Sequence, residues 1–199
     1  MRRIGIKDRC TAWLLDLEVR RKFFHLFALL LWLLPINLFP RPFTILLFLL
    51  VLLLNLLTVM SFWKDKLSFY YKLVYKLERE RNYSRPSRQA LWANLGIFLS
   101  FLIFGKDASL VGVVVLAVGD AFASIVGMRY GKRRIGNKSL EGALAFFLSV
   151  FFVLSPFIGL WQALAVALLS SAAELLPLKL DDNFTVPLTA ALVYKIIVL

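Results

Sequence analysis

Long apolar stretches separated by short basic segments dominate this chain of 199 residues. Residues 1–22 contain seven Lys and Arg, residues 64–88 contain eight and residues 129–138 contain five, out of 24 in the chain. The stretches between them are almost uncharged, and 60% of all residues are hydrophobic, against roughly 45–50% in an average soluble domain. A soluble fold cannot bury that much apolar surface, so the pattern predicts an all-α, polytopic transmembrane helical bundle.

The net charge of +12 would favour a nucleic-acid partner in a soluble chain. Here 20 of the 24 basic residues lie in the three short segments. That distribution is typical of loops on one side of a membrane, and we therefore expect membrane lipids and no nucleic acid as partners. One His and one Cys, far apart in the sequence, do not favour a zinc site of the usual type.

Seven segments are long and apolar enough to be considered as spans, because a helix needs roughly 20 residues to cross about 30 Å of hydrocarbon. The third is short, and the sixth and seventh carry Glu174 and Lys195, so six or eight spans stay open. We interpret residues 1–199 as a single integral membrane domain. The seven segments are Phe23 to Phe39, Phe43 to Trp63, Ala90 to Phe104, Leu110 to Met128, Leu140 to Leu160, Gln162 to Leu178 and Phe184 to Leu199.

Short loops rich in Lys and Arg stay on the cytoplasmic side of a membrane. This rule places the N-terminal basic amphipathic segment 1–22, the segment 64–88, the loop 129–139 and the turn at Lys179 in the cytoplasm, most simply at the cell (inner) membrane. The segment 64–88 mixes aromatic and basic residues at helical spacing, which predicts a helix in the headgroup layer against anionic lipid; an ordinary basic loop is the alternative.

Five acidic residues lie inside or at the ends of the predicted spans, where a charge costs about 2.5–3.5 kcal/mol on insertion scales. The predicted topology brings all five to the cytoplasmic side. Converging carboxylates suit a divalent cation such as Mg²⁺, which takes oxygen ligands, whereas single acids in structural ion pairs are the alternative. The five are Asp120, Glu141, Glu174, Asp181 and Asp182.

Two basic clusters complement these acids. The loop RYGKRRIGNK, residues 129–138, has five cations and two glycines that permit tight turns, which suits phosphate binding; the same loop would also be expected from topology alone. Before the first span, Glu18, Arg21, Lys22 and His25 share one helical face. An acid, two cations and an imidazole therefore point in one direction.

Three sequence elements together resemble the CTP-dependent lipid kinases, a family that includes dolichol kinase, phytol and farnesol kinases and the yeast-type diacylglycerol kinase. The elements are EVRRKFFH before the first span, VGDAFASIVGMRYGKRRIGNKSLEG in the middle and ELLPLKLDDNFTVPL near the C-terminus. They cover about a fifth of the chain. The resemblance implies a helical bundle with its active site at the cytoplasmic surface, with CTP as the donor and Mg²⁺ as the cofactor. It also implies a site formed by Arg21, Lys22, His25, Gly119, Asp120, Ala121, Ser124, Gly127, Gly131, Lys138, Ser139, Glu141, Gly142, Glu174, Asp181, Asp182, Asn183 and Pro187.

On this basis we assign expected roles to the site residues. Mg²⁺ would be held by Asp120, Glu174, Asp181 and Asp182. The proton acceptor is left open among Asp120, Glu141 and His25, because a carboxylate or an imidazole can serve as a base. The nucleotide would be bound by residues that supply cations, hydroxyls or close backbone approach: Arg21, Lys22, Ser124, Gly127, Arg129, Gly131, Lys132, Lys138 and Ser139.

The resemblance implies transfer of the γ-phosphate of CTP to the hydroxyl of a lipid alcohol, such as a polyprenol, a dolichol-like lipid or diacylglycerol. The related phosphatidate cytidylyltransferases are the alternative, but their C-terminal signature PKR…KD…PGHGG…D is absent. A transporter or scaffold is a further alternative; it predicts acids spread through the membrane depth. The sequence leaves open the choice of acceptor and whether the protein forms a homodimer.

Overall fold

The computed structural model describes residues 6–62, 64–78, 82–177 and 180–198. It confirms the all-α class, since the described strands form a single short hairpin. In chain order the elements are α1 (Ile6–Leu30), α2 (Leu33–Leu38), α3 (Arg41–Val59), α4 (Ser68–Leu77), α5 (Arg88–Phe104), α6 (Lys106–Val114), the π-helical turn η2 (Val115–Gly119), α7 (Asp120–Tyr130), β1 (Arg134–Ile135), β2 (Lys138–Ser139), α8 (Leu140–Ile158), α9 (Leu160–Leu175) and α10 (Asp182–Val198).

Most described residues of each of the seven predicted spans are helical, but the helices differ in length. Four helical segments are long and apolar enough to cross a membrane, namely Leu17–Leu38, Arg41–Val59, Lys106–Tyr130 and Leu140–Ile158. The apolar helices α5 and α9 have 17 and 16 residues. The four long segments indicate an integral membrane protein, whereas seven spans and a cytoplasmic N-terminus stay predictions.

Two glycines make the sharp corners between successive helices. Gly105 separates α5 from α6 and Gly159 separates α8 from α9, each with φ of +89°. Side chains with a Cβ rarely adopt this conformation, so glycine is the residue that lets the chain reverse within a single position.

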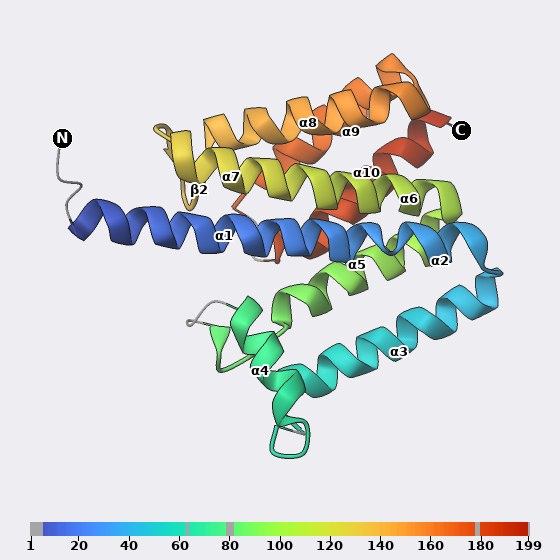
Figure 1. The fold of residues 1–199 in the computed structure, drawn as a ribbon. Helices are drawn as coiled ribbons and strands as arrows, with labels where there is room; N and C mark the ends of the chain where they lie inside the picture. Colours follow the sequence, from blue (N-terminus) through green and yellow to red (C-terminus); the bar gives the residue numbers. More distant parts are fainter. Residues whose placement is uncertain (1–5, 63, 79–81, 178–179, 199) are drawn as a thin grey trace.

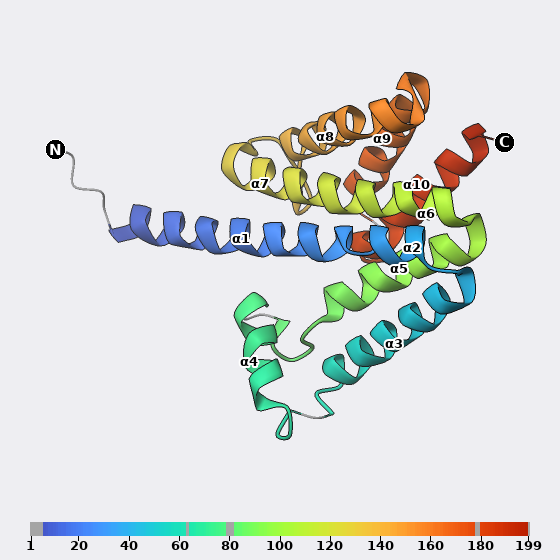
Figure 2. The same cartoon turned by 45° about the vertical axis from the view of Figure 1, so that its right-hand side comes forward.

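The long helix α1 runs along the molecule with α7 on one side and α5 and then α3 on the other (Figures 1 and 2). The segment Lys106–Tyr130 is the most buried of the candidate spans. Phe146 of α8 is fully buried against it, and Trp32 at the start of α2 stacks on Phe48 of α3 with ring centroids 3.8 Å apart. These contacts join both sides of α1 into one core.

The first half of α1, α4 and the β1–β2 hairpin lie at one end of the bundle, whereas the connections from α2 to α3, from α5 to α6 and from α8 to α9 lie at the other end (Figure 1). The hairpin, α4 and the connection from α9 to α10 share the end from which α1 begins. The predicted interfacial helix corresponds to α4, in which Tyr71 is buried and Phe69 is 83% exposed. The loops predicted to share one side of the membrane are thus neighbours in space, and their position relative to the bilayer remains a prediction.

Candidate functional site

A cavity of about 740 Å³ opens at this end of the bundle. All three sequence elements singled out above contribute to it, although they lie up to 160 residues apart. Its lining is mostly polar and comes from α1, α5, α7, the β1–β2 hairpin and the connection from α9 to α10. The residues are Arg21, Lys22, His25, Gln89, Asp120, Ser124, Arg134, Ile135, Gly136, Asn137, Lys138, Glu174, Leu175, Leu176, Pro177, Leu180, Asp181, Asp182 and Asn183.

Lys22 and Asp120 form an ion pair in the wall of this cavity. Lys22 Nζ lies 2.6 Å from Asp120 Oδ2, and the side chains are 11% and 26% exposed. Asp120 begins α7 directly after the π-helical turn η2, a rare geometry that is frequent at functional sites. The preceding Gly119 faces the ring of Phe146 so closely that a Cβ would collide with it. The close packing of Gly119 on α8 therefore fixes the position along α1 at which Asp120 contacts that helix.

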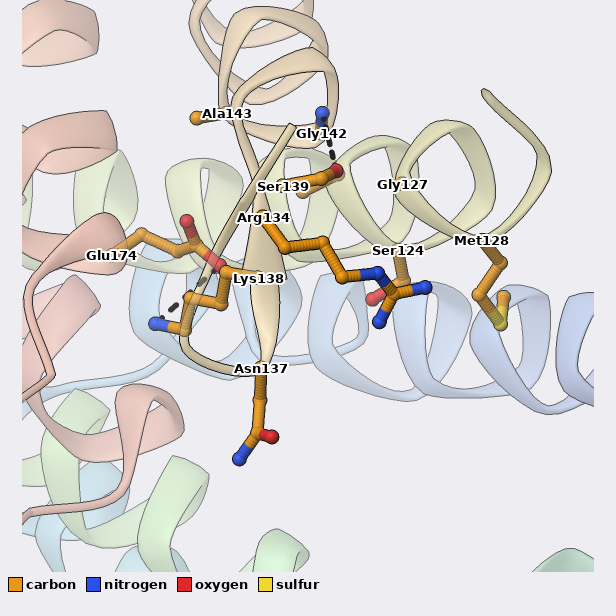
Figure 3. A pocket seen from close by; sticks show the side chains of 11 residues that line it. Ser124, Gly127, Met128, Arg134, Asn137, Lys138, Ser139, Gly142, Ala143 and Glu174 are labelled. Carbon is orange, nitrogen blue, oxygen red and sulfur yellow. Dashed lines mark hydrogen bonds and ion pairs between the residues drawn. The ribbon is translucent and has the colours of Figure 1, made fainter. Parts of the chain in front are cut away.

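Lys138 forms a second group with two acids. Its Nζ lies 2.8 Å from Asp182 Oδ2 and 3.5 Å from Glu174 Oε1. It is carried by the β1–β2 hairpin, which turns at Gly136 with φ of +60°. Figure 3 shows Lys138 and Glu174 facing each other across the gap between the hairpin and α9. Burial raises the pKa of the Asp182 carboxyl above its ordinary value, although Lys138 acts in the opposite direction.

The face of α1 predicted from the sequence is present in the structure, and its members have different partners. Arg21 pairs with Glu18 at 2.8 Å and donates a hydrogen bond from Nη1 to Gln89 Oε1 at 3.0 Å. His25 lies one turn beyond Lys22 and lines the cavity beside the Lys22–Asp120 pair. Arg21 is thus anchored to α5, while Lys22 is anchored to α7.

A smaller cavity of about 180 Å³ adjoins the first between α7, the hairpin and α8. Ser139 caps α8 by accepting a hydrogen bond from the Gly142 amide at 3.1 Å. Gly142 packs so tightly on α7 that a Cβ would lie 2.8 Å from the Ala123 carbonyl oxygen. Figure 3 shows Ser124, Gly127 and Arg134 around this space. The predicted residues Ser124, Gly127, Lys138 and Ser139 therefore come together here.

Eight residues predicted from the sequence are placed differently. Glu141 lines neither cavity, and its carboxylate accepts hydrogen bonds from the backbone amide of Arg133 at 3.3 Å, which holds the loop onto α8. Asp181 does line the larger cavity, but its Oδ1 accepts from the amide and side chain of Asn183 and so caps α10. Besides Glu141, the predicted site residues that line neither cavity are Gly119, Ala121, Arg129, Gly131, Lys132 and Pro187, while Lys179 lies outside the described residues.

The structure adds three polar residues to which the sequence reasoning gave no individual role: Gln89, Arg134 and Asn137. Arg134 and Asn137 belong to the basic loop, so their neighbourhood was predicted. Gln89 follows Arg88 at the start of α5, and no local pattern distinguishes it. Its contribution depends on α5 meeting α1, which periodicity alone does not reveal.

The acids in the cavity fit one mode of magnesium binding. Among the described residues, no three His, Cys, Asp or Glu side chains converge as a metal cluster. Mg²⁺ in phosphoryl-transfer sites usually takes one or two carboxylates, with phosphate oxygens and water as the other ligands. Asp120 and Asp182, each beside a lysine, fit that mode.

Comparisons with known proteins give distant relatives. The dolichol kinase of Schizosaccharomyces pombe is 38% identical over 112 residues, which are 50% of this chain and 22% of that protein. A probable chloroplastic phytol kinase of rice, Oryza sativa subsp. japonica, is 31% identical over 143 residues, 60% of this chain and 45% of that protein. An uncharacterized protein of Methanocaldococcus jannaschii is 36% identical over 109 residues, 52% of this chain and 56% of that protein.

This chain therefore matches only part of the length of these relatives. No family model and no solved structure matches it. The similarity to dolichol and phytol kinases confirms the resemblance inferred from the sequence motifs.

Proposed function

Because the chain is a distant homologue of dolichol and phytol kinases, we propose that it is a membrane lipid kinase. It transfers the γ-phosphate of CTP to the hydroxyl of a lipid alcohol. The relatives support a kinase with a nucleotide donor and a lipid alcohol acceptor. The choice of CTP rests on the motif resemblance.

One observation supports this proposal above the others: residues from all three motifs line a single cavity that contains both cations and carboxylates. A triphosphate carries several negative charges, and lysine or arginine side chains bind its oxygens through charge-assisted hydrogen bonds. Arg21, Lys22, Arg134 and Lys138 supply such groups from α1 and the hairpin. A transporter predicts acids spread through the membrane depth, whereas these acids share one end of the bundle.

Phosphoryl transfer needs positioning and charge neutralisation more than covalent chemistry from the protein. Asp120 and Asp182 would hold Mg²⁺, which neutralises charge on the phosphate oxygens. Lys22 and Lys138, now paired with these carboxylates, would bind the phosphates of the donor. Each lysine therefore holds a carboxylate in place and lies where it can also bind a phosphate oxygen.

The proton of the attacking hydroxyl requires an acceptor within the cavity. His25 and Asp120 both line it, whereas Glu141 lies outside, bonded to the loop backbone. A base must come within hydrogen-bond reach of the proton that it removes. We therefore assign this role to His25 or Asp120 and assign Glu141 to loop positioning.

The test is to incubate the purified protein in lipid nanodiscs with a lipid alcohol and CTP labelled separately at the α- and γ-phosphates. Label from the γ-phosphate in the lipid is the expected result. Label from the α-phosphate would instead identify a cytidylyltransferase, and transfer of neither label would refute both enzymes.

The matched variants are Asp120→Asn and Asp107→Asn. Both remove one carboxylate from the continuous segment Lys106–Tyr130, but Asp107 is exposed at the opposite end. We expect Asp120→Asn to lower kcat by at least about 100-fold, as for loss of a group that stabilises transition-state charge, and Asp107→Asn to retain activity. Full activity of Asp120→Asn with unchanged magnesium dependence would overturn its assignment.

A further inference from the structure

An apolar groove of about 530 Å³ lies beside the polar cavity. Its walls come from α1, α2, α3 and α5, and α3 diverges from α1 toward α4 (Figures 1 and 2). Ala28 and Leu31 form one wall, and Leu47 and Val51 of α3 face them across the groove. We call this space the tail groove.

Two polar side chains in the wall of the tail groove form a hydrogen bond with each other. Asn94 of α5 and Trp32 both line it, and the Trp32 indole N–H donates to Asn94 Oδ1 at 2.7 Å. A hydrogen-bonded pair of buried polar groups does not need a polar ligand to satisfy these two atoms. The groove therefore offers an apolar surface along most of its length.

The tail groove and the polar cavity meet at His25, which lines both. On α5 the change from polar to apolar occurs between neighbours, because Gln89 lines the polar cavity and Ala90 lines the groove. A molecule in the groove can thus place one polar end at His25 without leaving its apolar surroundings.

The dimensions and exposure of the groove fit a hydrocarbon chain within one leaflet. From His25 to Pro35 the helix rise gives a length of roughly 15 Å, about half of the 30 Å hydrocarbon core. Leu31 and Leu34 on its rim are 63% and 56% exposed, so the groove is open on the side where lipid would lie. A lipid can therefore reach it laterally.

We propose that the tail groove binds the hydrocarbon chain of the acceptor, a single-chain lipid alcohol, and places its hydroxyl beside His25 at the edge of the polar cavity. This inference rests on the proposed function, because it assigns the acceptor half of the same site. His25 also lines a second space toward α4, but that space has only about 140 Å³ against about 530 Å³ for the tail groove. One long chain therefore fits better than two chains of equal length.

The first experiment narrows the groove with Ala28→Phe and uses Ala172→Phe as the control, since Ala172 is exposed on α9. Transfer is measured to a long-chain and to a short-chain alcohol. The lost burial of several methylene groups should raise the KM of Ala28→Phe for the long chain by about tenfold or more. Transfer to the short chain and the affinity for CTP should match those of the control.

Equal kinetics of Ala28→Phe and Ala172→Phe toward the long chain would overturn the tail groove and leave the kinase intact. Absence of transfer by the unmodified protein would instead refute the proposed function. The two failures are thus distinguishable.

The second experiment needs neither a variant nor turnover. The unmodified protein in nanodiscs is illuminated with a long-chain alcohol that carries a diazirine in its tail, and the modified peptides are mapped by mass spectrometry. Labelling of Leu47 and Val51 that an excess of unreactive long-chain alcohol suppresses is the expected result. Labelling confined to outward residues such as Phe152 and Phe157, without competition, would overturn the proposal.

Discussion

The polar cavity contains two groups centred on a lysine. They differ in the number of carboxylates around the lysine and in the secondary structure that carries the lysine. Lys22 faces one carboxylate, that of Asp120, and both residues belong to long helices. Lys138 faces two carboxylates and belongs to a two-residue strand of a hairpin. The side chain of Asp182 is 40% exposed, compared with 26% for Asp120.

This difference separates two tasks that one cavity must combine. The Lys22–Asp120 pair is balanced in charge and fixed by helix packing, so it sets the geometry of the site. The Lys138 group has one more acid than base and is carried by a two-residue strand, so it can accept an additional cation. The following predictions test that division.

The largest effect is expected for Lys22→Met, which leaves Asp120 largely buried without its partner. Removal of one member of a buried ion pair costs about 3–5 kcal/mol. Thermal unfolding in detergent should therefore shift strongly downward, and transfer should be lost.

The double variant Lys22→Met/Asp120→Asn provides the control, because it removes both charges. Its unfolding temperature should recover much of the loss, whereas transfer should stay absent. If the single and double variants unfolded at the same temperature, the pair would not be coupled in the folded protein.

A smaller effect on stability is expected for Lys138→Met, since the hairpin that carries it is exposed. Loss of charged hydrogen bonds, worth about 1.5–3 kcal/mol, should raise the KM for CTP by about 10- to 100-fold. An unchanged KM for CTP with a raised KM for the lipid would place Lys138 on the acceptor side.

A modest effect is expected for Glu174→Gln, because Asp182 remains next to Lys138 in that variant. The contact of Glu174 with Lys138 is 3.5 Å long, compared with 2.8 Å for Asp182, so its loss should cost no more than about 1 kcal/mol and kcat/KM should fall by less than about fivefold. Asp182→Asn should lower it further and raise the magnesium concentration needed for half-maximal rate. Equal magnesium dependence in the two variants would contradict the assignment of the magnesium role to Asp182 rather than Glu174.

The smallest effect is expected for Arg129→Gln and Lys132→Gln. Both side chains are exposed and line neither cavity, so the KM for CTP should stay within about twofold of the unmodified protein. A tenfold rise would show that the hairpin reorganises around the nucleotide.

The positions of the helices could be predicted from the sequence because span length and hydropathy are local properties. The convergence of the three motifs at one end also followed, from the alternation of basic and apolar segments. Which acid faces the cavity did not follow, because it depends on helix rotation and on capping. Glu141 holds the Arg133 backbone and Asp181 caps α10, and both roles need the folded loop.

Contacts between residues that are far apart in the sequence could not be predicted from local sequence patterns either. Lys22 and Asp120 are separated by 98 residues, and the contact of α1 with α7 brings them together. Helical periodicity predicted that Lys22 and His25 share a face but said nothing about what that face meets.

The π-helical turn η2 also determines which face of the segment Lys106–Tyr130 carries Asp120. It holds one more residue per turn than α-helix, and one residue corresponds to a rotation of about 100°. Deletion of one residue between Val115 and Gly119 would restore a regular α-helix and leave Asp120 facing Lys22, whereas insertion of one more residue would rotate Asp120 by about 100° away from Lys22. This stretch should therefore tolerate the loss of one residue better than the gain of one.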